Sequence, residues 1–256
     1  MKKRKSNKHI NSQKTVGLFN LRAFLLLLLG FILALYAGWM ITASFGYGYS
    51  YWYGFYDSEQ HIALYAPQNK YRQGFEITTE SDHKALFQKI VESVHDDGKG
   101  LEDIHYVYKG AEIPLLHNAE IVHLQDVANL INQLHVISIT LLFMFLVLYV
   151  WHLRSLHQTG NLISAKNQFA IVSILSGVIV VIFLMFGAKE IFYQMHILIF
   201  PDDHQWFFYY QDSLMSTLMK APDLFAGIAI QILLTAFVLF GLGFWLNQSV
   251  VKKAQS

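Results

Sequence analysis

Residues 134–151 read LHVISITLLFMFLVLYVW, a run of 18 positions without Asp, Glu, Lys or Arg. A helix over this stretch is about 27 Å long, close to the hydrocarbon thickness of a bilayer. Three further windows lack charge in the same way, at 23–45, 169–188 and 224–246. With 54% hydrophobic and 14% charged residues, the composition is unlike that of a soluble globule. The sequence therefore predicts a mainly α membrane protein with four transmembrane helices.

The positions of the basic residues predict how these helices are oriented. Segments 1–22, 152–168 and 247–256 hold 11 Lys and Arg residues and no acidic residue, so all 18 acidic residues lie elsewhere. Because Lys and Arg are retained on the cytoplasmic side, we expect both chain ends in the cytoplasm. Segments 46–133 and 189–223 are then an extracytoplasmic cap and an extracytoplasmic loop of a cell-membrane protein.

The first window has an alternative interpretation as a cleaved signal peptide, with Ala43 and Ser44 at its exit. The run is longer than a usual signal core, and removing it would leave an odd number of crossings. The residues that follow it resemble an interfacial aromatic belt, namely Tyr47, Tyr49, Tyr51, Trp52, Tyr53, Phe55 and Tyr56. We therefore expect a retained helix.

The missing residues and motifs exclude several classes of chemistry. The chain has no cysteine, which removes disulfides, a thiol nucleophile and lipid attachment to its own thiols. It contains no His-Glu-x-x-His, no Gly-x-Ser-x-Gly and no phosphate loop. We expect no cofactor, no metal and no nucleic-acid partner.

The cap at 46–133 is predicted to be a small mixed α/β unit. Apolar residues recur at helical spacing after a possible N-cap at Ser81. They are Leu86, Phe87, Ile90, Val91 and Val94. Alternation before the turn Lys109-Gly110 predicts a short strand over Ile104, Tyr106 and Tyr108.

A helix is expected to begin at Asn118 and to run from the cap through the second span, because no Gly or Pro lies between Leu115 and Thr159. On it Glu120, His123 and Asp126 recur every three residues and share one face. His123 then lies about 16 Å above the span.

The third span is expected to continue as a helix until Pro201 stops it. This places His196 about 12 Å beyond the core, at a depth similar to that of His123. An aromatic run including Trp206 follows, and then Asp212. Two histidines near the outer headgroups are the candidate site.

Other interpretations remain open. An interfacial histidine is more often structural than catalytic, and most of the 12 histidines are expected to be so. Glu-x-x-His spacing occurs four times and is used by carboxylate-bridged metal sites, so a metal-dependent membrane enzyme or metal-handling protein is one alternative. A non-catalytic assembly or transport partner is another. Gln231, Ser173 and Ser176 are expected to form interhelical hydrogen bonds.

Two stretches carry a resemblance. They are NAEIVHLQDV at 118–127 and HILIFPDDHQW at 196–206, the second continuing to 212–214 and 221–225. Together with the layout of the spans they resemble the bacterial lipoprotein intramolecular transacylase (Lit) family, four-span membrane proteins of Gram-positive bacteria. The turn at 202–205 is more charged than the resemblance leads us to expect, and its role is open.

The resemblance implies an acyltransferase. Its substrate is a diacylated lipoprotein in the membrane lipid, and one acyl chain moves from the S-diacylglyceryl cysteine to the α-amino group, which gives the lyso form. The resemblance implies that His123 and His196 are the functional histidines. The positions that also match, in supporting roles, are Glu120, Asp126, Trp206 and Asp212.

Acid–base chemistry fits this reaction. An α-amino group titrates near pH 8, and a neutral imidazole can accept the proton that blocks its attack. Either His123 or His196 can be the base, with Asp126 or Glu120 fixing its tautomer and the second histidine assisting the oxyanion or the leaving oxygen. Which histidine is the base, the oligomeric state and the lipoproteins used remain open.

Overall fold

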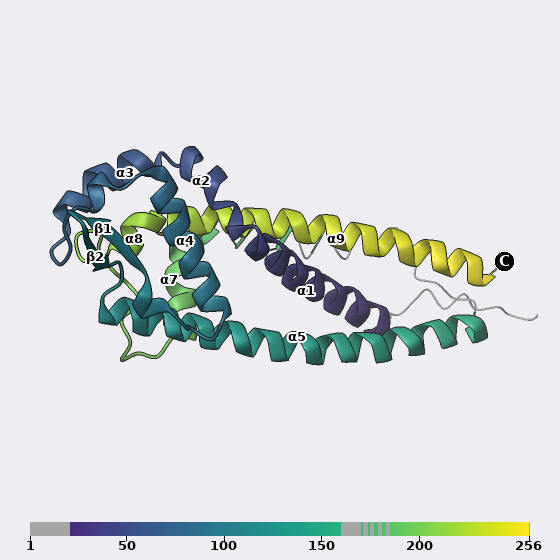
Figure 1. The fold of residues 1–256 in the computed structure, drawn as a ribbon. Coiled ribbons are helices and arrows are strands. Elements are labelled where there is room, and N and C mark those ends of the chain that lie inside the picture. The colour runs from purple at the N-terminus through teal and green to yellow at the C-terminus, as the bar shows by residue number, and fades with distance from the viewer. Residues whose placement is uncertain are drawn as a thin grey trace, which may run out of the picture.

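The structure is a computed structural model. Its fold consists of long helices that run side by side and a compact cap at one end of them (Figure 1). The structure describes residues 21–159 and 185–255, together with residues 170, 174, 177–178 and 181–182. The sequence predictions for the basic tail and for the 160–168 part of the cytoplasmic loop lie outside the described residues. So does most of the window 169–188.

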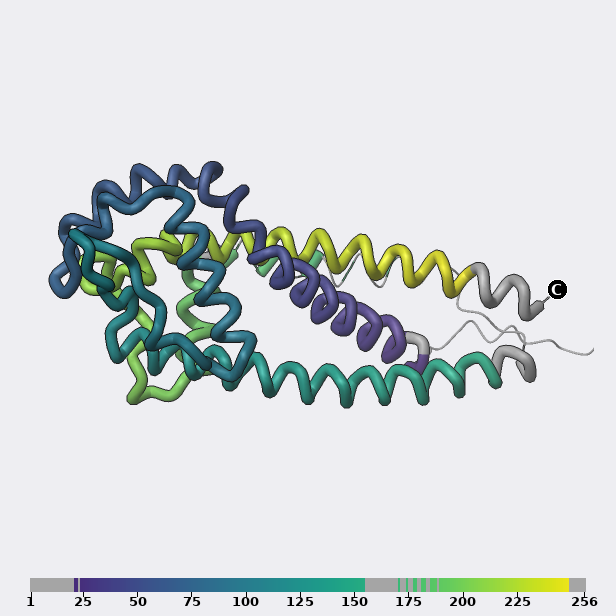
Figure 2. The backbone as a smooth tube through the Cα atoms, viewed as in Figure 1, coloured from purple at the N-terminus to yellow at the C-terminus, as the bar shows by residue number. Residues whose placement is uncertain are grey.

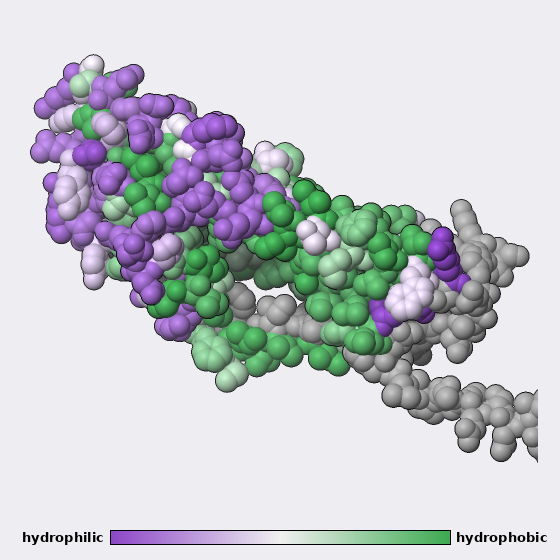
Figure 3. Space-filling view, turned by 90° about the horizontal axis from the view of Figure 1, so that it is seen from below, coloured by the Kyte–Doolittle hydropathy of each residue, from purple (hydrophilic) through white to green (hydrophobic). Residues whose placement is uncertain are grey.

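Three described helices are long and apolar enough to cross a membrane. They are α1 (Leu21–Ser44), α5 (Asn118–Thr159) and α9 (Asp223–Gln255), with candidate spans Phe24–Ser44, Asn118–Arg154 and Asp223–Gln248. Figure 3 shows apolar side chains covering these helices and polar ones covering much of the cap. This distribution is that of a membrane protein, as the sequence predicts.

Helix α1 packs against both α5 and α9. At its crossing with α9, a Cβ added at Gly38 would lie 3.1 Å from the backbone of Ala236 and of Ile232. The glycine therefore lets the two backbones approach closely, as small residues do in membrane helix pairs. The ring of Phe31 packs edge-on against Phe240, with centroids 5.7 Å apart.

In the structure, α8 (Leu214–Met219) of the segment 189–223 packs into the core of the unit at 46–133, and both are called the cap from here on. The cap is mainly helical with one small sheet. Its helices are α2 (Tyr49–Phe55), α3 (Ser58–Tyr65), α4 (Glu80–His95) and α8. Short 3-10 turns lie at Gly46–Gly48, Ala66–Gln68, Phe75–Ile77 and Leu101–Asp103. The sheet pairs β1 (His105–Tyr108) with β2 (Ala111–Pro114) in antiparallel register. The mixed α/β composition expected for the cap is therefore observed.

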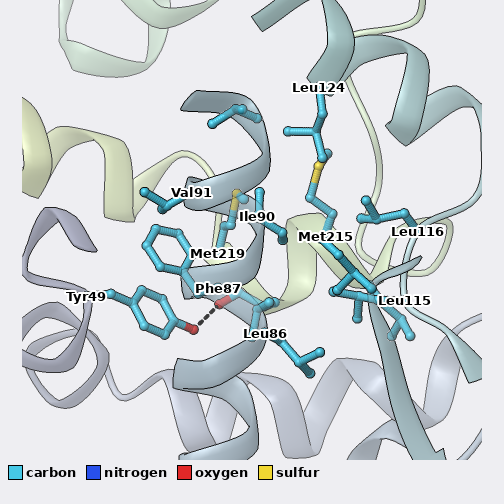
Figure 4. Close-up of a cluster of buried hydrophobic side chains, with 14 of the residues drawn as sticks. Tyr49, Leu86, Phe87, Ile90, Val91, Leu115, Leu116, Leu124, Met215 and Met219 are labelled. Carbon is cyan, nitrogen blue, oxygen red and sulfur yellow. Dashed lines mark hydrogen bonds between the residues drawn. The ribbon is translucent and has the colours of Figure 1, made fainter. Parts of the chain in front are cut away.

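The short helix α8 is the centre of the cap, since all six of its residues are buried. Around it lie apolar side chains of α4 and of the first turns of α5, as the close-up in Figure 4 shows. Tyr49 stacks on Phe87, with ring centroids 4.0 Å apart, and donates its hydroxyl to the carbonyl of Leu218 over 2.7 Å. Residues far apart in the sequence thus form one core.

Most of the predictions made from local sequence patterns in the cap are confirmed. The residues predicted to share the helical face of α4 are buried, and Lys109 and Gly110 both have positive φ at the hairpin turn. The N-cap is wrong, because Thr79 and not Ser81 accepts the backbone N–H of Asp82. The Asp82 carboxylate in turn accepts the backbone N–H of Thr79, which completes a capping box.

The helix predicted from the cap through the second span is confirmed, because α5 runs 42 residues from Asn118. The predicted continuation of the third span is wrong in one respect. Gly187 has φ 77° and interrupts the helix, so that α7 (Ala188–Ile199) starts anew after it. Helix α7 ends before Pro201, as expected.

Gln231 of α9 accepts a hydrogen bond from the Trp52 indole of α2, as expected for an interhelical contact. Ser173 and Ser176 lie outside the described residues.

Candidate active site

Two histidines from different helices meet where α7 lies against the first turns of α5. The imidazole centroids of His123 and His196 are 6.0 Å apart. In Figure 2 the green chain of α7 and the loop after it cross beside the teal start of α5. The tertiary fold therefore brings together the two histidines that sequence and resemblance single out.

One hydrogen bond defines the tautomer of His196. Its Nδ1 lies 2.7 Å from the carbonyl oxygen of Phe192, one helical turn earlier. A carbonyl can only accept, so Nδ1 carries the proton and the neutral ring keeps its lone pair on Nε2. Burial lowers the pKa of His196 below its ordinary value. At neutral pH this residue is therefore a neutral base with a defined basic atom.

The surroundings of His196 are aromatic. Its ring lies 4.9 Å from that of Trp206 and 4.0 Å from that of Phe192, measured between centroids. Phe200, at the end of α7, lies 5.2 Å away. These rings leave the imidazole half-buried and limit its rotation.

His123 is more deeply buried, with 7% of its surface exposed. Its Nδ1 is buried and has no hydrogen-bond partner within the described residues. Phe200 packs edge-on against its ring at 4.9 Å, and Phe208 lies at 6.1 Å. Burial first, and then the neighbouring His196, lower its pKa to about 4. Both imidazoles are therefore neutral at pH 7.

Glu120 does not serve the histidines directly. One carboxylate oxygen accepts the Ser213 hydroxyl and, over 3.2 Å, the backbone N–H of Met215, while the other accepts the His117 N–H over 2.6 Å. The side chain is 1% exposed, and burial raises the pKa of its carboxyl. Glu120 thus connects the start of α5 to the N-terminus of α8 and holds the cap core against the site.

Asp126 pairs with a histidine that sequence reasoning did not select. Its Oδ2 accepts the Nδ1–H of His204 over 2.6 Å, which raises the pKa of His204. We expected Asp126 or Glu120 to fix the tautomer of a catalytic histidine. Among the described residues neither carboxylate bonds to His123 or His196, and a backbone carbonyl takes that role for His196. The unusual charge of the turn at 202–205 was the one signal that pointed to His204.

The other two predicted positions differ in their relation to the site. Trp206 contacts His196 directly, as given above. Asp212 forms an ion pair with Lys70 over 2.7 Å, which joins the segment before α8 to the loop after α3. The described side-chain contact of Asp212 is with that loop and not with either imidazole.

The titratable groups around the histidines do not gather into a metal-binding set. In the parts of the chain that the structure describes, no three His, Asp or Glu side chains lie close enough together to hold one ion. The features present are two neutral imidazoles, an aromatic enclosure and the end of an apolar helix bundle. This arrangement suits proton transfer in a water-poor setting.

Fold and site together define a helical membrane protein in which two histidines from different helices meet beside a cap with an apolar core. Residues 76–221 match the model of the family described as lipoprotein intramolecular transacylase Lit. The match covers more than half of the chain and includes both histidines, and the chain belongs to this family. Searches among curated proteins and among solved structures returned no match. Family membership implies transacylase activity in lipoprotein modification.

Proposed function

We propose that this protein moves one acyl chain within a diacylated lipoprotein, from a glyceryl oxygen of the S-diacylglyceryl cysteine to the α-amino nitrogen of the same cysteine. The C–N bond of the amide forms, the C–O bond of the ester breaks, and the glycerol oxygen leaves as a hydroxyl. No water and no second substrate is consumed. Amine and ester belong to one molecule, so holding them in contact supplies much of the rate.

His196 is the base in this proposal. Its Nδ1–H is held by the Phe192 carbonyl, which leaves Nε2 to take the proton of the attacking amine. Its lowered pKa keeps Nε2 unprotonated at the pH where the amine becomes nucleophilic. The fixed ring directs that lone pair to a single place, and this fixed lone pair is the observation that carries the assignment.

His123 is the second proton-handling group. As a neutral imidazole it has one N–H, which can stabilise the oxyanion that develops on the ester oxygen. The same N–H can protonate the leaving glycerol oxygen. The proton that His196 took from the amine then passes to His123, which restores both neutral imidazoles and leaves no net change in protons. The two ring centroids are 6.0 Å apart, so one ester group placed beside both rings lies within reach of both imidazoles.

The membrane arrangement belongs to the same proposal. The chain crosses four times, with spans at 23–45, 134–151, 169–188 and 224–246, and both ends are cytoplasmic. The basic segments and the three described apolar helices support this topology. The ester of a lipoprotein lies at the outer headgroups, so the cap and both histidines face outward.

Lipid analysis tests the function. The full chain is expressed in a bacterial strain that lacks other N-acylation, and the N-terminus of a reporter lipoprotein is examined by mass spectrometry. We expect the lyso form, with one amide-linked acyl chain, and its loss in the His196→Ala and His123→Ala variants. A reporter that keeps a free amine and two esters in the presence of the wild-type protein would refute the activity. Full conversion by both variants would refute the site.

A further inference from the structure

The ion pair of His204 and Asp126 has no part in the mechanism above. His204 lies in the loop after α7, and Asp126 lies on α5, one turn beyond His123. The Nδ1 and Oδ2 atoms are 2.6 Å apart, and the side chains are 36% and 13% exposed. Neither residue has a described hydrogen bond or ring contact with the two imidazoles, although the charge of Asp126 acts directly on His123, whose pKa it raises. An effect of His204 on the imidazoles therefore passes through Asp126 or through the loop.

The loop carries two of the rings that enclose the site. Phe200 lies four residues before His204 and contacts His123, with centroids 4.9 Å apart. Trp206 lies two residues after His204 and contacts His196 at the same distance. His204 is therefore attached to α5 between the two aromatic contacts.

The loop has little else to hold it in place by hydrogen bonds. Within the described part of the chain, the other bonds of residues 200–207 are local. Phe200 N–H donates to the last turn of α7, His204 N–H to Pro201, and the Gln205 amide to Phe207. The bond from His204 to Asp126 is the one that reaches α5. The carboxylate, with Asp203 acting in the same direction, raises the pKa of His204 and favours its charged form.

We propose that His204 and Asp126 form a latch that holds the loop at 200–207 closed, with Trp206 and Phe200 against the two histidines. His204 is then a positioning residue for the proposed acyl transfer, on which this inference rests. The closed loop keeps water from the ester while the amine attacks.

Opening the latch has two consequences that differ from simple loss of folded protein. The imidazoles lose the ring contacts with Phe200 and Trp206 that restrain them, and kcat falls about tenfold, since small misplacements of reacting groups are costly. Water also reaches the ester carbonyl and competes with the amine. Attack by water breaks the same C–O bond but releases a free fatty acid, and the α-amine stays unacylated. The ratio of fatty acid to N-acyl product therefore reports the latch.

The test uses the full chain in detergent and a synthetic peptide with an S-diacylglyceryl N-terminal cysteine. His204→Ala removes the latch, whereas His204→Asn keeps an N–H donor near the position of Nδ1. We expect His204→Ala to lower kcat about tenfold and to raise the ratio of fatty acid to N-acyl product. We expect His204→Asn to recover most of both values. His105→Ala is the matched control, because His105 also makes one Nδ1 hydrogen bond, to the carbonyl of Asp103 in the cap, and it should behave as wild type.

A reversible latch separates positioning from folding. Because the chain has no cysteine, an Asp126→Cys, His204→Cys double variant can be joined by a short bis-methanethiosulfonate linker and released by reduction. We expect the linked protein to form more N-acyl product and less fatty acid than the same sample after reduction.

The outcomes separate the two proposals. If the wild type makes no N-acyl product, the proposed function fails. If the wild type is active but His204→Ala retains its kcat and its product ratio, the latch is refuted and the function stands. A linked double variant that is no better than the reduced one also refutes the latch.

Discussion

The imidazole of His196 lies on the indole of Trp206, with ring centroids 4.9 Å apart and ring planes inclined by 33°. The two residues come from α7 and from the loop after it. Together with the Nδ1 bond to Phe192, this contact leaves the His196 ring little freedom to turn. A base that accepts a proton from one direction needs such restraint.

Replacing Trp206 tests the value of this contact. Aromatic pairs contribute about 1 kcal/mol beyond their burial, so Trp206→Ala should lower kcat by roughly fivefold with little change in KM. Trp206→Phe keeps a ring against His196 and should lose much less. Steady-state kinetics on the diacylated peptide measures both. Equal losses in the two variants would show that the ring itself does not matter.

The two histidines should act as a unit. Removing a general acid or base typically costs about 10²–10⁴ in rate, and we expect this for His196→Ala and for His123→Ala. The double variant should be no slower than the worse single variant, because one proton path is already broken. Single-turnover rates of the three variants decide the matter. Losses that multiply would mean independent roles.

The pH profile follows from the lowered pKa of His196. The amine must be neutral, and its pKa lies near 8, so log kcat/KM should rise with a slope of one below that pH. The rate depends on the loss of a second proton only at pH values where His196 itself titrates. Because burial shifts this pKa downward, the steeper limb of slope two should begin below the ordinary histidine value of 6.5.

Rates of N-acyl formation between pH 5 and 8 provide the measurement of this profile. A steep limb that starts above pH 6.5 would contradict the assignment of His196 as a buried neutral base. His196→Ala should lack the limb altogether.

Glu120 should be tested for stability. Glu120→Ala leaves the Ser213 hydroxyl and the backbone N–H groups of Met215 and His117 without their acceptor. Buried donors without partners cost about 1–3 kcal/mol each, so the free energy of unfolding should fall by about 3 kcal/mol or more. Glu120→Gln retains one acceptor oxygen and should lose less. Denaturant unfolding in detergent compares them, with Glu112→Ala, an exposed carboxylate on β2, as the neutral control. A Glu120→Ala protein as stable as that control would contradict the capping of α8.

The orientation can be tested by labelling, because the chain has no cysteine of its own. Ser81→Cys places a thiol at an exposed position of α4, and Ser6→Cys places one in the basic N-terminal segment. A membrane-impermeant maleimide added to intact cells should label only the first variant, and both after lysis. Labelling of Ser6→Cys in intact cells would reverse the proposed topology.

Sequence patterns were sufficient wherever the determining physics is local. Uninterrupted apolar runs predicted α1, α5 and α9, because a backbone in lipid must bond internally and the side chains facing lipid must be apolar. The absence of Gly and Pro after Asn118 predicted the length of α5, and alternation before Lys109-Gly110 predicted the strand β1 and the turn after it, though not the partner strand β2. The break at Gly187 was missed because glycine is tolerated within helices and only the backbone path shows whether it turns there.

By itself, the sequence determined the apolar helices, the shared face of Glu120, His123 and Asp126, and the candidate pair of histidines. Only the tertiary structure decided which partner each polar group receives. Glu120 accepts hydrogen bonds at the N-terminus of α8, and Asp126 accepts the Nδ1–H of His204. Spacing along one helix defines which residues share a face, but hydrogen bonds between segments some 80 residues apart depend on how the cap packs, and no local pattern records that packing.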